Sequence, residues 1–137
     1  MAKDFTELIA WQLAVELADF VANMTRRPAL ARDRVFCAQA NDAAESAPRN
    51  IAEGFGRFAP KEFAQHMRIA IGSELETRNQ ILEAARKDAI TPAERDRGVL
   101  LTRRAVTAAL RLRRYLRSSR ARANAERIEN SRNAENL

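Results

Sequence analysis

Arginine residues are concentrated in the last third of the chain, where their spacing suits the binding of phosphate groups. Residues 94–137 hold 12 arginines and 5 acidic residues, whereas residues 1–93 hold 12 Lys and Arg and 13 Asp and Glu. Between Gly98 and Ala123 there are eight arginines and no acidic residue. Arginines three, four or seven positions apart share one face of a helix. Such a face could neutralise successive phosphates of a nucleic acid.

This spacing predicts a nucleic-acid-binding surface made of Arg103, Arg104, Arg111, Arg114, Arg117 and Arg120. Tyr115 is the one aromatic residue beside them, so stacking on bases is not indicated. Contacts with phosphates alone carry no base information, and we expect binding to RNA or DNA without sequence specificity. A solvated helix face remains the alternative interpretation of the same arginines.

Catalytic and metal-binding patterns are weak. Di-iron bundles need Glu-x-x-His pairs on two helices, and His66 is the sole histidine, with Glu62 four residues before it. Cys37 is the sole cysteine and lies near an alanine-rich face, as a small core residue would. No set of His and Cys completes a zinc site. We therefore expect no enzymatic activity, no cofactor and no metal.

The run Gly54-Phe55-Gly56-Arg57 could suggest a phosphate-binding loop, but its context argues against one. No strand pattern precedes it and no Gly-Lys-Ser/Thr follows. Glycine often closes a helix in a left-handed conformation, and proline suits the first turn of the next helix. We expect Gly54 and Gly56 to end one helix and Pro60 to begin another.

Apolar periodicity and cap signals predict four helices and no strands. The expected ranges are about residues 6–24, 33–55, 61–87 and 92–116, with Pro48 kinking the second helix. We therefore expect an all-α fold, an up-down-up-down antiparallel four-helix bundle over residues 1–118. Residues 119–137 form an Arg-rich extension, for which a fraying helix and a disordered tail are both open.

Two motifs resemble those of a known family. Asn50-Ile51-Ala52-Glu53-Gly54 follows Ser46-x-Pro48 and precedes Gly56-Arg57, and Ile69-Ala70-x-Gly72-Ser73-x-x-Glu76 lies downstream. Together with Gln39, Ala43 and Ala44, they are similar to the signatures of the four-helix-bundle proteins encoded in intervening sequences of bacterial large-subunit rRNA. The resemblance covers roughly residues 5–116. Family members often have basic residues where this chain has Asn41 and Asp42, so nucleic-acid contact is not expected from the second helix.

The resemblance implies an up-down bundle that assembles as a ring, a homopentamer, with a role that involves nucleic acid. Related bundles are accessory proteins of diversity-generating retroelements, where they bind a reverse transcriptase and RNA. A protein-interaction scaffold whose ring docks a protein partner is therefore the alternative function. The structural residues of the matched motifs are Asn50, Glu53, Gly54, Gly56, Arg57, Gly72, Ser73 and Glu76. Their polar members are expected to form a hydrogen-bonded network that joins the second helix to the third, with a binding site at the bundle end as the alternative.

The residues themselves also favour self-association. The first helix is apolar around most of its circumference, so it needs neighbours on more than one side. The fourth helix carries a second apolar seam, Val99, Val106 and Leu110, which we expect to form the oligomer interface.

Length and cysteine content favour a single domain in a reducing compartment. The 137 residues suffice for one core, and Cys37 cannot form an internal disulfide. The N-terminus lacks the layout of a signal peptide, and no apolar run approaches the length of a membrane span. We expect a soluble, cytoplasmic protein that does not bind membranes.

Overall fold

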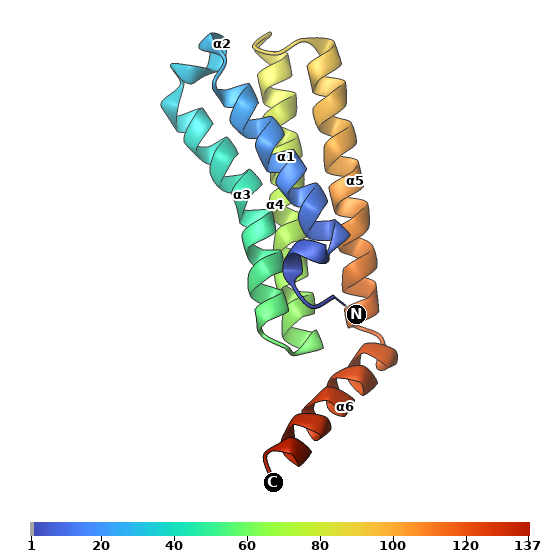
Figure 1. Ribbon diagram of the computed structural model, residues 1–137. Coiled ribbons are helices and arrows are strands. Elements are labelled where there is room, and N and C mark those ends of the chain that lie inside the picture. The colour runs from blue at the N-terminus through green and yellow to red at the C-terminus, as the bar shows by residue number, and fades with distance from the viewer. Residues whose placement is uncertain (1) are drawn as a thin grey trace.

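The computed structural model describes residues 2–137 and contains helices throughout. Its elements are a 3-10 helix η1 (Phe5–Glu7) and the α-helices α1 (Ile9–Thr25), α2 (Pro28–Ala31), α3 (Arg34–Gly56), α4 (Pro60–Arg86), α5 (Pro92–Leu116) and α6 (Ser119–Glu135). The described residues include no strand, so the all-α prediction is confirmed, with two more helices than expected. The helices α1, α3, α4 and α5 lie side by side, and successive ones run in opposite directions (Figure 1).

Local signals explain where the long helices begin. Thr91 Oγ1 accepts a hydrogen bond from Glu94 N at 3.1 Å, and Glu94 Oε1 accepts one from Thr91 N at 3.0 Å, which closes the capping box predicted for α5. Asp33 caps α3 by accepting a 3.1 Å hydrogen bond from Phe36 N. Pro60 and Pro92 occupy the first turns of α4 and α5, where no backbone donor is needed.

The corner between α3 and α4 differs from the prediction. No glycine among residues 2–137 has a positive φ, and α3 continues through Gly54 to Gly56. Phe58 takes the left-handed conformation instead, with φ of 55°. The prediction that one helix ends near Gly56 and the next begins at Pro60 is confirmed, but the prediction of a left-handed glycine at this corner was wrong.

Close packing explains why Gly54 has no side chain. A Cβ atom at Gly54 would lie 2.6 Å from Phe63 Cδ1 and 2.8 Å from His66 Cβ, both on α4. Gly54 is buried, so α3 and α4 approach closely at this point. A Cβ atom at Gly56 or Gly72 would meet nothing within 4 Å in the described chain apart from the neighbouring backbone of its own helix.

The core consists of two apolar clusters along the helical bundle. One contains Leu17, Phe36, Ile81 and Leu101, and the other contains Ile51, Phe63, Met67 and Leu116. Buried alanines on all four long helices, among them Ala14, Ala44, Ala70 and Ala105, allow the helices to approach closely. No helix among residues 2–137 has both the length and the apolar character that crossing a membrane requires.

The Arg-rich extension forms helix α6, which leaves the end of α5 at an angle (Figure 1). Ser118 Oγ accepts a 3.3 Å hydrogen bond from Ala121 N and so caps the helix. Ala121 is buried, and the guanidinium of Arg132 lies 5.3 Å from the ring centre of Phe58. A fraying helix and a disordered tail were both left open for residues 119–137. The structure has a helix there, and this helix contacts α4 and α5.

Candidate nucleic-acid interface

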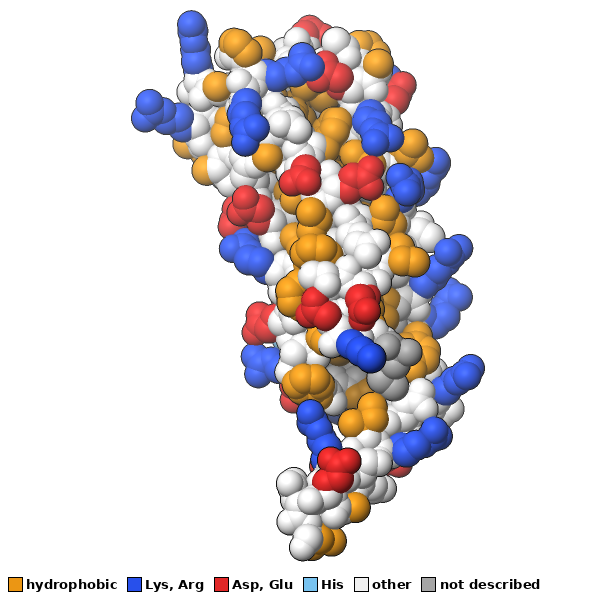
Figure 2. Space-filling model, viewed as in Figure 1, with side chains coloured by type: hydrophobic (Ala, Val, Ile, Leu, Met, Phe, Trp, Pro, Cys, Tyr) orange, Lys and Arg blue, Asp and Glu red, His pale blue; other side chains and the backbone are white. Residues whose placement is uncertain are grey.

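The arginines predicted to bind nucleic acid are all solvent-exposed. On α5 and just beyond it these are Arg103, Arg104, Arg111, Arg114 and Arg117, and Arg120 lies in the first turn of α6. Lys and Arg side chains project along the edge of the molecule that α5 forms (Figure 2). Helix α5 therefore sets the backbone positions of the arginines that it carries in a row.

One carboxylate on α1 partly neutralises this row. Glu16 Oε1 lies 3.3 Å from Arg97 Nη2 and 4.0 Å from Arg104 Nη1. Ion pairs between exposed side chains contribute little to stability and are screened by salt. The contact with Glu16 therefore holds Arg104 only weakly.

The apolar seam predicted on α5 borders the arginines. Val99 and Val106 are half-buried, and the Leu110 side chain is 46% exposed. On α4, Ile69 and Leu75 are exposed by 49% and 51%. The monomer therefore leaves large apolar side chains uncovered on both helices.

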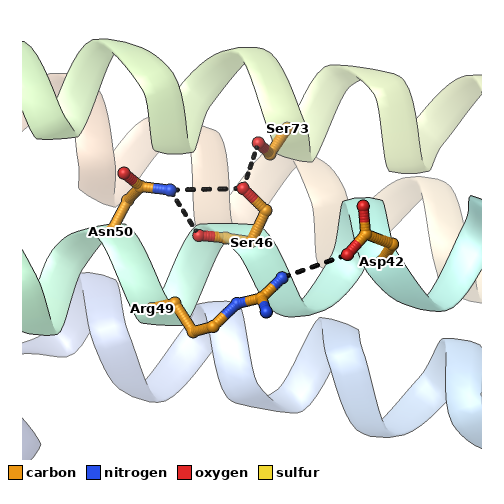
Figure 3. Close-up of polar contacts among 5 residues, drawn as sticks. All are labelled: Asp42, Ser46, Arg49, Asn50 and Ser73. Carbon is orange, nitrogen blue, oxygen red and sulfur yellow. Dashed lines mark hydrogen bonds and ion pairs between the residues drawn. The ribbon is translucent and has the colours of Figure 1, made fainter.

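A hydrogen-bonded network joins α3 to α4, and part of it was predicted (Figure 3). Ser73 Oγ donates to Ser46 Oγ at 2.9 Å, and Asn50 Nδ2 donates to the backbone oxygen of Ser46 at 2.8 Å. Asn50 Oδ1 lies 3.2 Å from His66 Nδ1, which extends the network along α4. Asn50 and Ser73 thus lie where the network was expected, with Ser46 and His66 as additional members.

The other polar motif residues lie outside this network. Glu53 and Arg57 form an exposed ion pair of 2.9 Å at the C-terminal end of α3. Glu76 is exposed, and the described chain offers it no hydrogen bond or ion pair across the helices. Arg49 reaches Asp42 on the outer side of α3 at 3.3 Å (Figure 3).

Sequence reasoning missed the buried carboxyl group of Glu74. Its side chain is fully buried, and neither carboxyl oxygen has a hydrogen-bond partner within residues 2–137. Burial raises the pKa of Glu74 from 4.5 to about 8, so the group is mostly protonated at neutral pH. The sequence did contain a signal for this burial, because position 74 continues the helical spacing of Met67, Ala70 and Ile81 on the buried face of α4.

Arg113 was also missed. Its side chain is half-buried toward α4 and α6, and its Nε atom is buried with no hydrogen-bond partner among the described residues. Most of the other arginines of α5 point to solvent. Helical periodicity alone does not tell an arginine that faces another helix from one that faces solvent, because this depends on where α4 and α6 pack.

The remaining candidate residues have structural surroundings. Cys37 is half-buried and its thiol donates to the backbone oxygen of Leu30 at 3.1 Å, while burial and then Asp33 raise its pKa. Within residues 2–137, no three His, Cys, Asp or Glu side chains are grouped in a way that could hold a metal ion.

These features define an all-helical bundle with a basic helix on its surface and a polar network between two of its core helices. The family of 23S rRNA-intervening sequence proteins matches residues 6–105, which include both sequence motifs. The chain belongs to this family. Comparison with curated proteins gives no significant match.

Proposed function

We propose that the protein is a non-catalytic oligomeric module that binds RNA or DNA through α5. The observation that carries this proposal is the exposed row of arginines, Arg103, Arg104, Arg111 and Arg114, on a stretch without acidic residues. Membership of the rRNA-intervening sequence family supports an rRNA-related, non-catalytic role. Arg117 and Arg120 extend the row toward α6, and phosphate contacts along it would bind without base specificity.

The unit of assembly in this proposal is an up-down-up-down antiparallel four-helix bundle of α1, α3, α4 and α5, repeated in a ring of five chains. Uncovered apolar groups support assembly: Leu110 and Leu75 on one side, and on the other a shallow groove of about 370 Å³ that includes Trp11, Val15 and Pro48. Val99 and Val106 would lie at the interface with Leu110. Several arginine rows on one particle would raise the effective concentration for a long nucleic acid.

Titration of duplex DNA or RNA at several salt concentrations tests the proposal. The logarithm of the affinity should fall with the logarithm of salt concentration, with a slope of roughly −0.9 per phosphate neutralised on duplex DNA. The fourfold variant Arg103→Gln, Arg104→Gln, Arg111→Gln, Arg114→Gln should lose binding and keep its helix content and oligomer size. A matched control removes the same charge from exposed arginines elsewhere: Arg32→Gln, Arg34→Gln, Arg78→Gln, Arg86→Gln.

The outcomes separate the alternatives. Absence of binding by the parent at about 50 mM salt, where phosphate contacts are strongest, would reject the proposal. Equal losses in the two fourfold variants would mean that overall charge, and not α5, governs binding. Binding that survives in both fourfold variants would move the site to Arg120 and Arg122. Loss of the oligomer in that variant would show that the arginines pair subunits.

The second candidate function is a scaffold whose ring docks a protein partner, such as a reverse transcriptase. The exposed apolar side chains of Ile69, Leu75 and Leu110 favour it, because they suit a protein surface better than a nucleic acid. Under this proposal the arginines would serve solubility or subunit pairing. Protein binding that persists in the fourfold α5 variant and is lost in Leu75→Glu would support it.

A further inference from the structure

A basic pocket lies where α4, α5 and α6 meet. It has a volume of about 510 Å³ and lies between the first half of α4, the end of α5 and the start of α6. Its lining includes five basic side chains and no acidic one: Lys61, Arg68, Arg113, Arg117 and Arg122. These residues are 61 positions apart at the extremes, so only the fold brings them together.

The turn after α5 builds this pocket. Helix α5 ends at Leu116, and Ser118 caps α6 with its side chain. Burial of Ala121, which is 4% exposed, holds the first turn of α6 against the bundle. Arg122 follows directly and completes the pocket opposite Arg68 and Lys61 of α4.

The cations of the pocket lack partners within the described chain. None of the five basic side chains forms an ion pair with a carboxylate of residues 2–137. The buried Nε–H of Arg113 also lacks an acceptor there. Unpaired charged groups around a pocket are favourable partners for an anion, which would accept hydrogen bonds from the accessible nitrogens of the five side chains. Arginine presents several donors in a planar fork that suits phosphate oxygens.

The number of charges indicates the class of anion. A single phosphodiester carries one negative charge, whereas five cations around one pocket suit a group with several. A volume of about 510 Å³ accommodates more than one phosphate unit. We propose that this pocket binds the oligophosphate group of a nucleotide, either free or at the 5′ end of an RNA strand. The pocket shares only Arg117 with the arginine row and lies within one chain, so it goes beyond the proposed function.

Isothermal titration of the full chain with inorganic tripolyphosphate tests the pocket. One tripolyphosphate should bind per chain at about 50 mM salt, a concentration at which phosphate contacts are weakly screened. The pocket variant Arg68→Gln, Arg113→Gln, Arg122→Gln should lower the affinity by about tenfold or more, since each charge-assisted hydrogen bond is worth at least that factor. The matched control Arg103→Gln, Arg104→Gln, Arg111→Gln removes equal charge from the row and should change the affinity by less than about threefold.

A second variant guards against effects on folding. Arg113 is half-buried, so its loss could disturb the packing of α4 on α5. Arg68 and Arg122 are exposed, and Arg68→Gln with Arg122→Gln should lower the affinity while circular dichroism and the melting temperature stay unchanged. Equal weakening by the pocket and control triples, or no binding of tripolyphosphate by the parent, would overturn the proposal.

The source of the oligophosphate is distinguished with three further probes. These are adenosine triphosphate, a short single-stranded RNA with a 5′-triphosphate, and the same RNA with a 5′-hydroxyl. Tighter binding of the triphosphate RNA than of the hydroxyl RNA, abolished in the pocket variant, would assign the site to RNA ends. The site would instead be assigned to free nucleotides if the two RNAs bind equally and the pocket variant loses binding of adenosine triphosphate. If none of these probes binds the pocket, the titration of duplex nucleic acid against the arginine row of α5 can still succeed. The two proposals can therefore be rejected independently.

Discussion

The hydroxyl group of Ser73 on α4 donates a 2.9 Å hydrogen bond to the hydroxyl group of Ser46 on α3 (Figure 3). Ser46 in turn accepts from Asn50 Nδ2 at 3.2 Å, and Asn50 contacts His66. The network therefore alternates between α3 and α4 and fixes how one helix is set along the other. Half-buried polar groups of this kind add specificity to a contact that is otherwise mainly apolar.

Coupling between these two serines is the first prediction. Ser46→Ala and Ser73→Ala should each lower the free energy of unfolding, and the double variant should cost less than the sum. The expected coupling is about 0.5–1.5 kcal/mol, the usual contribution of one hydrogen bond. Urea denaturation of the parent, both single variants and the double variant measures it. Strictly additive losses would show that the two hydroxyl groups do not interact in solution.

Gly54 is predicted to tolerate no side chain. Gly54→Ala should destabilise the protein by about 1–3 kcal/mol, because the new methyl group would overlap Phe63 and His66. Gly72→Ala is the matched control within a helix, where the added Cβ meets nothing within 4 Å. That control should stabilise α4 by about 0.5–1 kcal/mol. Thermal melts compare the two variants, and a harmless Gly54→Ala would mean that α3 and α4 are further apart.

Glu74 is predicted to make stability depend on pH. Its pKa is 4.5 in the ordinary state and about 8 in the folded protein, so the folded state binds more protons between these values. The free energy of unfolding should therefore fall as pH rises from about 4.5 to 8, and the loss is complete above pH 8. Below pH 4.5 Glu74 is protonated in both the folded and the unfolded state, so it does not change how the free energy of unfolding varies with pH.

Glu74→Gln removes this titration and is the variant that checks it. Relative to the parent, it should gain stability on going from pH 5 to pH 9, on the order of a few kcal/mol. Glu76→Gln, which changes an exposed carboxylate two positions along α4, should show no such gain. Urea denaturation at the two pH values measures the difference. Parallel pH profiles for the parent and Glu74→Gln would contradict the burial of a protonated carboxyl group.

Assembly gives the fourth prediction. Multi-angle light scattering at micromolar concentration should yield a multiple of the 15.4 kDa chain mass, with five chains expected. Leu110→Glu should weaken the oligomer while the helix content is kept, because Leu110 is 46% exposed and supports little of the monomer core. Val35→Glu is the control, since Val35 is 69% exposed on α3, away from the seam. A monomeric parent would contradict the prediction.

The sequence by itself determined the four long helices and their limits to within about three residues, but it did not predict α2. Residues 92–116 were predicted as a helix and form α5 with those limits, while α3 and α4 differ from prediction by about one residue at each end. These features depend on local physics, namely apolar periodicity and caps such as that of Thr91 and Glu94. The exposure of Arg103 and Arg114 followed from the same periodicity.

Only the tertiary structure decided the features that depend on how the helices are set against one another. Phe58 takes the left-handed conformation predicted for glycine, whereas Gly54 lies where α3 and α4 approach closely. Glu74 shares its face with apolar residues, yet its complete burial without a partner depends on the neighbouring helices. The pocket that includes Arg68, Arg113 and Arg122 likewise requires three helices to converge, a relationship that no local pattern in the sequence encodes.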